Sequence, residues 1–552
     1  MKFLFSALLF LCILQATFAQ NKQFTRQDTL RGSITPERAW WDLVYYDLDV
    51  QIFPEKKSLT GSNTVTYKVL QPKQRLQIDL QGPMHLLSAT QHGKKLQITS
   101  EGSAHFISLQ AKQPIGSLQK IKLLFDGQPV IANNPPWDGG WTWKKDSLGK
   151  PFIANANQGI GASVWWPNKD HPYDEVDSLD VKATVPQELM AVSNGRLVDS
   201  ISAKAGTMTY HWTVKNPINN YGVNINIADY AHFSDSYNGE KGKLDLDFYV
   251  LKQNLAKAKK QFEQVPDMLE AFEYWMGSYP FYADGYKLVE VPYLGMEHQS
   301  SVTYGNKYAN GYLGRDLSGS GWGHKFDYII IHESAHEWFA NNITNKDVAD
   351  MWIQEGFTTY AENLFVDYHF GKKASSEYVL GQRKLVRNDK PIIGIYGVNQ
   401  EGSSDMYFKG ANILNSLRYI VNDDERWREI LRGIGSTFYH QTVTSATIEN
   451  YISEQTGIDL QAFFDQYLRT TKIPKLEYTL AANAVRFRYT NSVAGFNAPV
   501  DVKINGKMLR IVPSEKWAEL SLKRKINAFE IDPNFYIETY KSSNAVHQST
   551  HY

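Results

Sequence analysis

Two histidines four residues apart, His332 and His336, carry the clearest chemical signal in this sequence. On a helix this spacing places both imidazoles on one face, one turn apart, so both can bind the same metal ion. Glu333 follows the first histidine and is rotated from it by about 100°, which brings its carboxylate near the metal without binding it. The pattern His-Glu-x-x-His indicates a zinc site.

A zinc site that performs chemistry needs three protein ligands and an open position for water. Eighteen residues separate His336 from Glu355, which is the candidate third ligand. Apolar residues recur at helical spacing around Glu355, so it is expected on a second helix. Glu362 lies two turns further along the same face, where its carboxylate can accept a proton from a ligand histidine.

These residues resemble the aminopeptidase N family, the gluzincin zinc aminopeptidases that include the leukotriene hydrolase. The family pattern is His-Glu-x-x-His, eighteen residues, and then Glu within an Asn-Glu-Gly-Phe-like run, which is Gln-Glu-Gly-Phe at 354–357 here. The resemblance covers roughly residues 40–540 and is strongest over 290–410. It implies that zinc is held by His332, His336 and Glu355, and that Glu333 acts as general base.

Residues 294–298 read Leu-Gly-Met-Glu-His and are similar to the family motif Gly-x-Met-Glu-Asn. The resemblance implies that Gly295 and Met296 contact the substrate and that Glu297 binds its free α-amino group. An internal peptide bond offers no such cation, so this contact selects chain ends. His298 replaces the family Asn, and we expect it to lower activity as it becomes charged below about pH 6.5.

Residues 158–172 look like the family segment Gln-x-x-x-Ala-Arg-x-x-Phe-Pro-Cys-x-Asp-Glu-Pro. Ser163 stands where the family has Arg, which puts the contacts inside this loop in doubt. The resemblance implies that Gln158 helps to hold the amino terminus of the substrate. A loop amide bonded to the backbone is the alternative for Gln158.

Tyr407 begins the run Tyr-Phe-Lys-Gly-Ala, which is similar to the family's Tyr-x-Lys-Gly-Ala. The resemblance implies that Tyr407 donates a hydrogen bond to the oxyanion of the tetrahedral intermediate. A tyrosine at the start of a helix, taken alone, more often serves packing. Trp137, Trp141 and Trp143 form a tryptophan patch near turn glycines, for which packing or a loop over the active cleft is favoured over sugar binding.

The composition excludes an electrostatic nucleic-acid binder, because Lys+Arg and Asp+Glu balance at 58 each. Residues 1–19 read as a secretory signal: Lys2 precedes an apolar run over 3–14, and Thr-Phe-Ala at 17–19 offers small residues before cleavage. An uncleaved anchor is the alternative. The only cysteine, Cys12, lies in this segment, so an exported protein without thiols is expected in the periplasm or outside the cell.

At 552 residues the chain is expected to hold two to four domains and to be a multidomain α+β protein. Residues 20–241 alternate as strands and show no helical period, which predicts an all-β sandwich or saddle. Residues 242–472 are mostly helical, and the resemblance implies a thermolysin-like zinc catalytic domain. Residues 473–541 predict a small β-sandwich, and 542–552 a polar disordered tail.

Two helical stretches are specified more closely. The apolar stripe over 255–276 predicts a helix that splits near Pro266. The pattern over 448–467 predicts one further helix. No stretch beyond the signal is long and apolar enough to span a bilayer.

The residues together predict an exported zinc aminopeptidase that hydrolyses the first peptide bond of peptides with a free amino terminus. A zinc endopeptidase with an open cleft and a non-catalytic peptide-binding module with a relic site are the alternatives. Many family members continue with a large helical domain that roofs the cleft. This sequence continues only through the predicted sandwich, so a more open cleft is expected.

Overall fold

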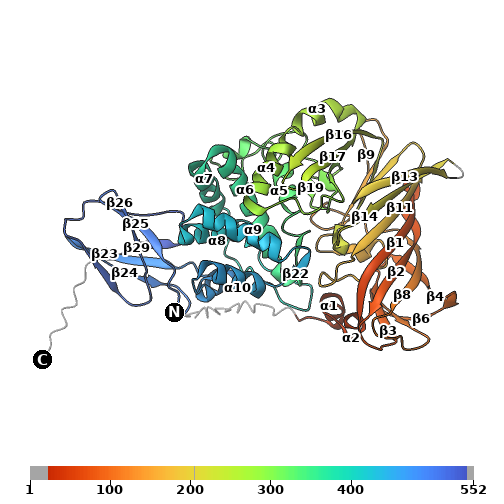
Figure 1. Cartoon of the computed structure of the whole chain (residues 1–552), viewed down its shortest axis with the longest axis horizontal. Helices are drawn as coiled ribbons and strands as arrows, with labels where there is room; N and C mark the ends of the chain where they lie inside the picture. The colour runs from red at the N-terminus through yellow and green to blue at the C-terminus, as the bar shows by residue number, and fades with distance from the viewer. Residues whose placement is uncertain (1–22, 204–205, 544–552) are drawn as a thin grey trace, which may run out of the picture.

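The computed structural model describes residues 23–203 and 206–543. A strand-rich N-terminal part, a helical middle part and a C-terminal pair of sheets follow one another along the long axis (Figure 1). This arrangement confirms the multidomain α+β fold. The predicted signal at 1–19, with Cys12, and residues 544–552 of the predicted tail lie outside the described residues.

The N-terminal part is built on an eight-stranded sheet whose central strand, β1, pairs in parallel with β11 and antiparallel with β2. Buried and half-exposed side chains alternate along β11, as expected for a sheet with one face on the core. The strands follow in the order β13 (Arg196–Ala203), β14 (Thr207–Val214), β11 (Ser178–Pro186), β1 (Trp41–Phe53), β2 (Ser58–Val69), β8 (Leu118–Gly127), β4 (Met84–Gln91) and β5 (Lys94–Lys95).

Two smaller sheets complete this part. The first has the order β12 (Met190–Ser193), β15 (Ile225–Ala228), β10 (Pro151–Ala156) and β9 (Gly140–Lys145), and the second β3 (Arg75–Asp79), β7 (Ala104–Ser108) and β6 (Gln97–Glu101). Trp141 on β9 is fully buried and stacks on Trp143 with ring centroids 5.1 Å apart. The tryptophan patch therefore serves packing, except that Trp137 remains 62% exposed.

Two short helices, α1 (Arg26–Gly32) and α2 (Pro36–Ala39), precede the first strand, so the expectation of a purely β segment over 20–241 was wrong. A capping box starts α1: the Thr25 hydroxyl accepts from the backbone of Asp28, and the Asp28 side chain accepts from the backbone of Thr25. The helix is only seven residues long, too short for a sustained apolar period.

The middle part contains a five-stranded sheet in the order β16 (Tyr230–Gly239), β17 (Gly242–Leu251), β18 (Tyr286–Glu290), β20 (Val302–Tyr304) and β19 (Gly295–Met296). β16 lies on the N-terminal side of the predicted boundary at 241/242, yet it forms a hairpin with β17 in this sheet. A change from strand to helix patterning marks the first helix of a domain and misses strands that come before it. β19 is an edge strand, paired with β20 alone among the described strands.

Helices pack over this sheet and form most of the middle core. They are α3 (Leu255–Gln261), α4 (Gln264–Met276), α5 (Tyr328–Ala335), α6 (Trp352–Phe370), α7 (Lys372–Arg383), α8 (Phe408–Val421), α9 (Asp424–Thr437), α10 (Ser445–Thr456) and α11 (Gln461–Leu468). The expected break near Pro266 is confirmed, since this proline lies in the first turn of α4.

The single helix expected over 448–467 was wrong, because the chain breaks into α10 and α11. Gly457 ends α10 in the left-handed conformation, with φ +69°, and its N–H bonds to carbonyls of the last turn. A short parallel pair, β21 (Ile343–Asn345) and β22 (Gln441–Val443), ties the segment after α5 to the start of α10.

The C-terminal part consists of two sheets. Their orders are β27 (Ala518–Ser521), β24 (Ala484–Thr490), β23 (Lys475–Leu480) and β29 (Glu538–Lys541), and β26 (Lys507–Ile511), β25 (Val500–Ile504) and β28 (Phe529–Ile531). Inward residues of both sheets join the core of the middle part. Within the described residues, no helix has the length and apolar character to cross a membrane.

Candidate active site

A buried aspartate fixes the start of α5, the helix that carries the first two candidate ligands. The Asp327 carboxylate accepts from the backbone N–H groups of Ile329 at 3.1 Å and Ile330 at 3.4 Å, so it caps the helix. It also accepts from the Tyr304 hydroxyl at 2.7 Å, which ties α5 to β20. Sequence reasoning missed Asp327, although an aspartate just before the apolar helical run is a start signal.

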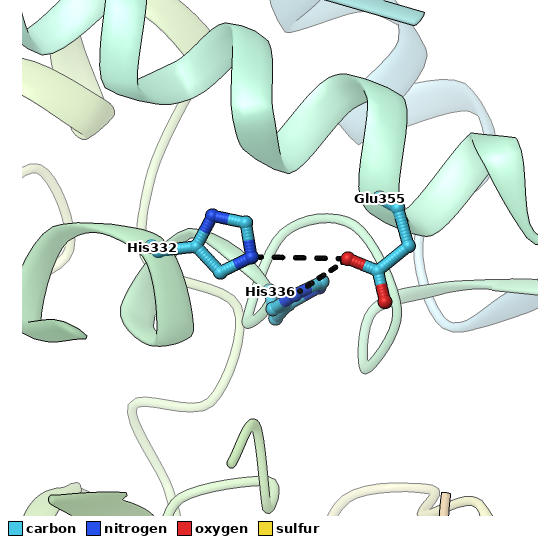
Figure 2. Close-up of side chains that lie close together, drawn as sticks. All are labelled: His332, His336 and Glu355. Carbon is cyan, nitrogen blue, oxygen red and sulfur yellow. Dashed lines mark ion pairs between the residues drawn. The ribbon is translucent and has the colours of Figure 1, made fainter. Parts of the chain in front are cut away.

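The three predicted ligands converge from two helices (Figure 2). His332 lies on α5, His336 just after its last residue, and Glu355 in the first turn of α6. Oε2 of Glu355 is 3.4 Å from Nε2 of His336 and 3.8 Å from Nε2 of His332. One ligand atom from each residue lies within 4.8 Å of the others, and all three side chains are buried.

The hydrogen bonds of the histidines show which ring nitrogens are free for a metal. Nδ1 of His332 lies 2.7 Å from the Glu362 carboxylate, and Nδ1 of His336 lies 3.0 Å from the Phe339 carbonyl. Since a carboxylate and a carbonyl only accept, each Nδ1 is the donor, and in the neutral imidazole each Nε2 carries a lone pair that can bind a metal. Among the residues that the structure describes, Oε2 of Glu355 is buried without a hydrogen-bond donor. Two imidazole lone pairs and a carboxylate facing one another fit one zinc ion.

Glu362 orients the first histidine. Besides Nδ1 of His332, its carboxylate accepts from the Tyr378 hydroxyl at 2.7 Å and the Gln382 amide at 2.8 Å. Three donors thus hold the Glu362 carboxylate in place, although the side chain is fully buried. The ring of His332 is therefore held in one orientation and one tautomer.

Glu333 lies where β19 approaches α5 most closely. A Cβ on Gly295 would lie 2.6 Å from Cγ2 of Ile329 and 3.2 Å from Cγ of Glu333, so only glycine fits at this point of the strand. Burial, opposed by His332 and reinforced by Glu297, raises the pKa of Glu333 to about 7. A carboxylate tuned to this range can act as a general base near neutral pH.

Gln158 links the N-terminal part to this cluster. It lies in the loop after β10, and its Nε2 donates to Oε1 of Glu297 at 2.8 Å and to Oε1 of Glu355 at 2.9 Å. Glu297 follows β19 and is buried, with its backbone carbonyl bound by the Asn341 amide at 2.9 Å. Burial raises the pKa of Glu297. The structure therefore brings the two predicted amino-terminus anchors into direct contact beside the ligands.

Tyr407 lies at the start of α8, and its ring stacks on His332 with centroids 6.1 Å apart. Burial and the nearby Glu355 carboxylate raise the pKa of Tyr407 well above 10, so the hydroxyl stays a donor. Tyr407 and Met296 line one pocket of about 580 Å³ together with the ligands. Trp137 lines this pocket as well, so one residue of the tryptophan patch does belong to the cleft.

Residues 260–467 match the family model described as "Peptidase family M1 domain", and this segment contains Glu297, Glu333, Tyr407 and the three ligands. Residues 260–467 therefore form a peptidase family M1 domain. It is 21% identical over 427 residues to "Probable aminopeptidase 1" of Saccharolobus solfataricus, covering 73% of this chain and 53% of that protein. It is 24% identical over 278 residues to "Endoplasmic reticulum aminopeptidase 1" of Mus musculus, covering 48% and 29%.

The fold matches a solved member of family M1. The M1 zinc metallopeptidase from Deinococcus radiodurans superposes with a TM-score of 0.66 at 20% identity, covering 80% of this chain and 97% of that chain. In contrast, the chain spans about half or less of the length of the curated relatives above.

The substitution at His298 in the M1 motif does not act as expected. His298 is 1% exposed, and burial lowers its pKa to about 3. Both ring nitrogens are buried without a hydrogen-bond partner among the described residues. The expectation that His298 becomes charged below pH 6.5 was therefore wrong, because a protonated imidazole would lack both water and a counter-charge.

Tyr221 borders the M1 site and was not found from the sequence. It lies between β14 and β15, in the 3₁₀ turn Asn220–Gly222. Burial and the carboxylates of Glu297 and Glu355 raise the pKa of its hydroxyl well above 10. A lone tyrosine in an asparagine-rich turn offers no spacing signal that would mark it as part of a site.

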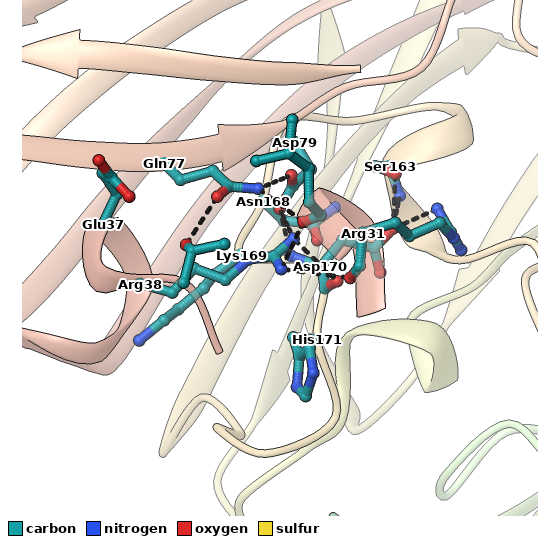
Figure 3. Close-up of polar contacts among 12 residues, drawn as sticks. Arg31, Glu37, Arg38, Gln77, Asp79, Ser163, Asn168, Lys169, Asp170 and His171 are labelled. Atoms are coloured by element: carbon teal, nitrogen blue, oxygen red, sulfur yellow. Dashed lines mark hydrogen bonds and ion pairs between the residues drawn. The ribbon is translucent and has the colours of Figure 1, made fainter. Parts of the chain in front are cut away.

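The loop that carries Gln158 is held from behind by α1. The Arg31 guanidinium donates to the carbonyls of Gly159, at 3.3 Å, and Ile160, the two residues directly after Gln158. It also pairs with the Asp170 carboxylate at 3.6 Å. Figure 3 shows Arg31, Asp170 and Ser163 meeting at one point.

The contacts of Arg31 bear on the loop position where the family has an arginine and this chain has Ser163. Ser163 donates to Asp170 through both its backbone N–H, at 3.2 Å, and its hydroxyl. The guanidinium comes instead from Arg31, 132 positions earlier in the chain than Ser163. Asp79 connects to the same contacts: its carboxylate pairs with Arg38 at 2.7 Å and accepts from the Asp170 N–H at 3.1 Å. Arg31, Ser163 and Asp170 thus hold this part of the loop together.

Proposed function

We propose that this chain is a zinc-dependent aminopeptidase that removes the first residue of peptides with a free amino terminus. The position of Glu297 is the observation that carries the proposal. Its carboxylate lies in one 4.8 Å cluster with Glu333 and a ligand atom of His336. An α-ammonium bound there has its own first peptide bond beside the catalytic carboxylate. The aminopeptidase names of the matched relatives support the same activity.

Zinc held by His332, His336 and Glu355 would lower the pKa of a water molecule towards ~7 and polarise the scissile carbonyl. Glu333 takes a proton from the attacking water and transfers it to the leaving amine. Tyr407 donates its hydroxyl to the carbonyl oxygen as negative charge develops there, a contact typically worth ~2.7–4 kcal/mol. Glu297 and Gln158 fix the amino terminus, which aligns the bond with the base.

The test compares aminoacyl anilides with free and N-acetylated amino groups, before and after removal of zinc by a chelator. The proposal expects turnover of the free substrates only, loss with the chelator and recovery on adding zinc. The Glu297→Gln variant should lose at least tenfold in kcat/KM on free substrates, because a charge-assisted hydrogen bond contributes ~1.5–3 kcal/mol. If Glu297→Gln lowers kcat/KM on acetylated substrates by the same factor as on free substrates, Glu297 is not the amino anchor.

Two other outcomes identify the alternatives. Internal cleavage of blocked peptides at comparable rates would indicate a zinc endopeptidase. Stoichiometric zinc without turnover of any substrate in the panel would indicate a peptide-binding module with a relic site.

Export is a separate proposal. It is supported by Lys2, the apolar run over 3–14 and the small residues at 17–19. The matured protein should begin at Gln20, which amino-terminal sequencing of the exported material determines. Retention of residues 1–19 in a membrane fraction would indicate an anchor instead.

A further inference from the structure

A second groove adjoins the catalytic pocket and shares two of its walls. Trp137 and Leu294 line both the pocket that holds the ligands and an open groove next to it. Much of the groove wall is apolar or aromatic, including Tyr293, Tyr308 and Leu313. The mechanism above uses none of these residues beyond the shared wall.

The edge strand β19 gives a bound peptide its direction. Gly295 pairs with Tyr304 and Met296 with Thr303, so one side of β19 is occupied by β20 and the other faces the site. Glu297 follows the carboxyl end of β19. A peptide whose ammonium lies at Glu297 and whose backbone extends along β19 therefore runs antiparallel to the strand. Its later residues pass Leu294 and reach the groove.

The exposed charges of this groove are positive, and Lys257 also interacts electrostatically with the buried Glu290. Lys257 on α3 and Lys307 after β20 both line it and are exposed, and neither takes part in an ion pair of the described residues. The one carboxylate in its wall, Glu290, is buried and accepts from the Leu251 N–H at 2.7 Å and the Asn254 amide at 2.6 Å. In a chain with a formal net charge of zero, this pair of lysines is a local positive site.

The backbone that carries Lys307 is held in an unusual conformation. Lys307 and Tyr308 have φ +58° and +59°, in the left-handed region that non-glycine residues rarely adopt. The Tyr308 N–H donates to the Tyr304 hydroxyl at 2.8 Å, and that hydroxyl donates to the buried Asp327 at the start of α5. The lysine is thus presented from a segment tied to the helix of the metal ligands.

We infer that this groove binds the residues after the scissile bond, and that Lys257 and Lys307 bind the free α-carboxylate of short peptides. The substrate class is then short peptides with a free carboxyl terminus, because the groove begins directly beside the catalytic pocket. The inference rests on the proposed aminopeptidase function and adds recognition of the opposite end of the substrate.

The experiment compares each tri- to pentapeptide as its free acid and as its carboxyl-terminal amide, which differ only in the negative charge. The wild-type protein should cleave the acid with a kcat/KM roughly tenfold higher, and the preference should shrink at high salt. The Lys257→Met, Lys307→Met double variant keeps the aliphatic stems and should lose the preference. The Lys257→Arg, Lys307→Arg double variant should keep it. Lys259→Met, also on α3 but outside the groove lining, is the matched control.

An aminoacyl anilide has no carboxyl terminus, so its turnover reports on the catalytic centre independently of Lys257 and Lys307. If the protein cleaves the anilide but cleaves the peptide acid and the peptide amide at equal rates, this inference is overturned and the proposed function stands. A preference that persists in the double methionine variant would also overturn it. Absence of all turnover would overturn the proposed function. In that case, calorimetric binding of the same peptide pairs decides whether the lysines recognise the carboxylate.

Discussion

Gly356 of α6 and Gly410 of α8 face each other so closely that position 410 has no room for a side chain. A Cβ on Gly410 would lie 2.8 Å from the Cα of Gly356. Gly356 directly follows the ligand Glu355, and Gly410 is three residues after Tyr407. The contact between the two glycines therefore sets the separation of the third ligand and the tyrosine hydroxyl.

Gly410→Ala should reduce both stability and turnover. Forcing a methyl group into this contact costs typically ~1–3 kcal/mol of unfolding free energy and moves α8 away from α6. Because Tyr407 moves with α8, kcat should fall more than KM rises. Denaturant unfolding and steady-state kinetics measure the two effects. An unfolding free energy and a kcat equal to those of the wild type would show that the added methyl group fits without moving α8.

Glu333→Gln should keep the metal and lose the chemistry. The amide cannot accept a proton at neutral pH, so kcat should fall by several orders of magnitude, more than the 10²–10⁴-fold typical of general acid–base catalysis alone. Zinc content, measured by elemental analysis, should remain one per chain because Glu333 is not a ligand. Full activity in this variant would remove Glu333 from the mechanism.

Arg31→Met should weaken substrate binding through Gln158. Without the guanidinium, the carbonyls of Gly159 and Ile160 lose their donor and the loop after β10 is less fixed. The expected result is a rise of about threefold to tenfold in KM for free amino termini, with a smaller change in kcat. Arg26→Met on the same helix removes an exposed ion pair with Glu101 and should leave both constants unchanged. An effect equal in the two variants would mean that α1 acts only through overall stability.

His298 should make the protein sensitive to acid without shaping its activity profile. Its pKa is about 3 in the folded state against an ordinary value of 6.5. As pH falls below 6.5 the unfolded chain takes up a proton that the folded chain does not. The unfolding free energy should then fall by ~1.4 kcal/mol per pH unit between about pH 6 and 4 from this residue alone.

His298→Asn should remove this slope, whereas His92→Asn at an exposed turn serves as the comparison. Unfolding midpoints across the pH series measure the slopes. The pH profile of kcat/KM should keep its shape in His298→Asn. Identical slopes for the variant and the wild type would mean that the imidazole takes up a proton in the folded protein.

The sequence alone determined the residues whose relation is local or periodic. The four-residue spacing of His332 and His336 and the helical context of Glu355 depend on one helix geometry each, which the chain encodes within a turn or two. Alternation over single strands likewise located most of the sheets. The breaks it missed, such as Gly457 between α10 and α11, depend on one backbone conformation rather than on a repeated pattern.

Only the tertiary structure decided which distant residues meet. Gln158 contacts Glu297 and Glu355 across 139 and 197 positions. The Arg31 guanidinium pairs with Asp170 in a loop whose own motif lacks an arginine. The burial that keeps His298 neutral and the groove with Lys257 and Lys307 also arise from packing between remote segments. Such contacts depend on how whole elements pack in space, and no spacing along one chain specifies that arrangement.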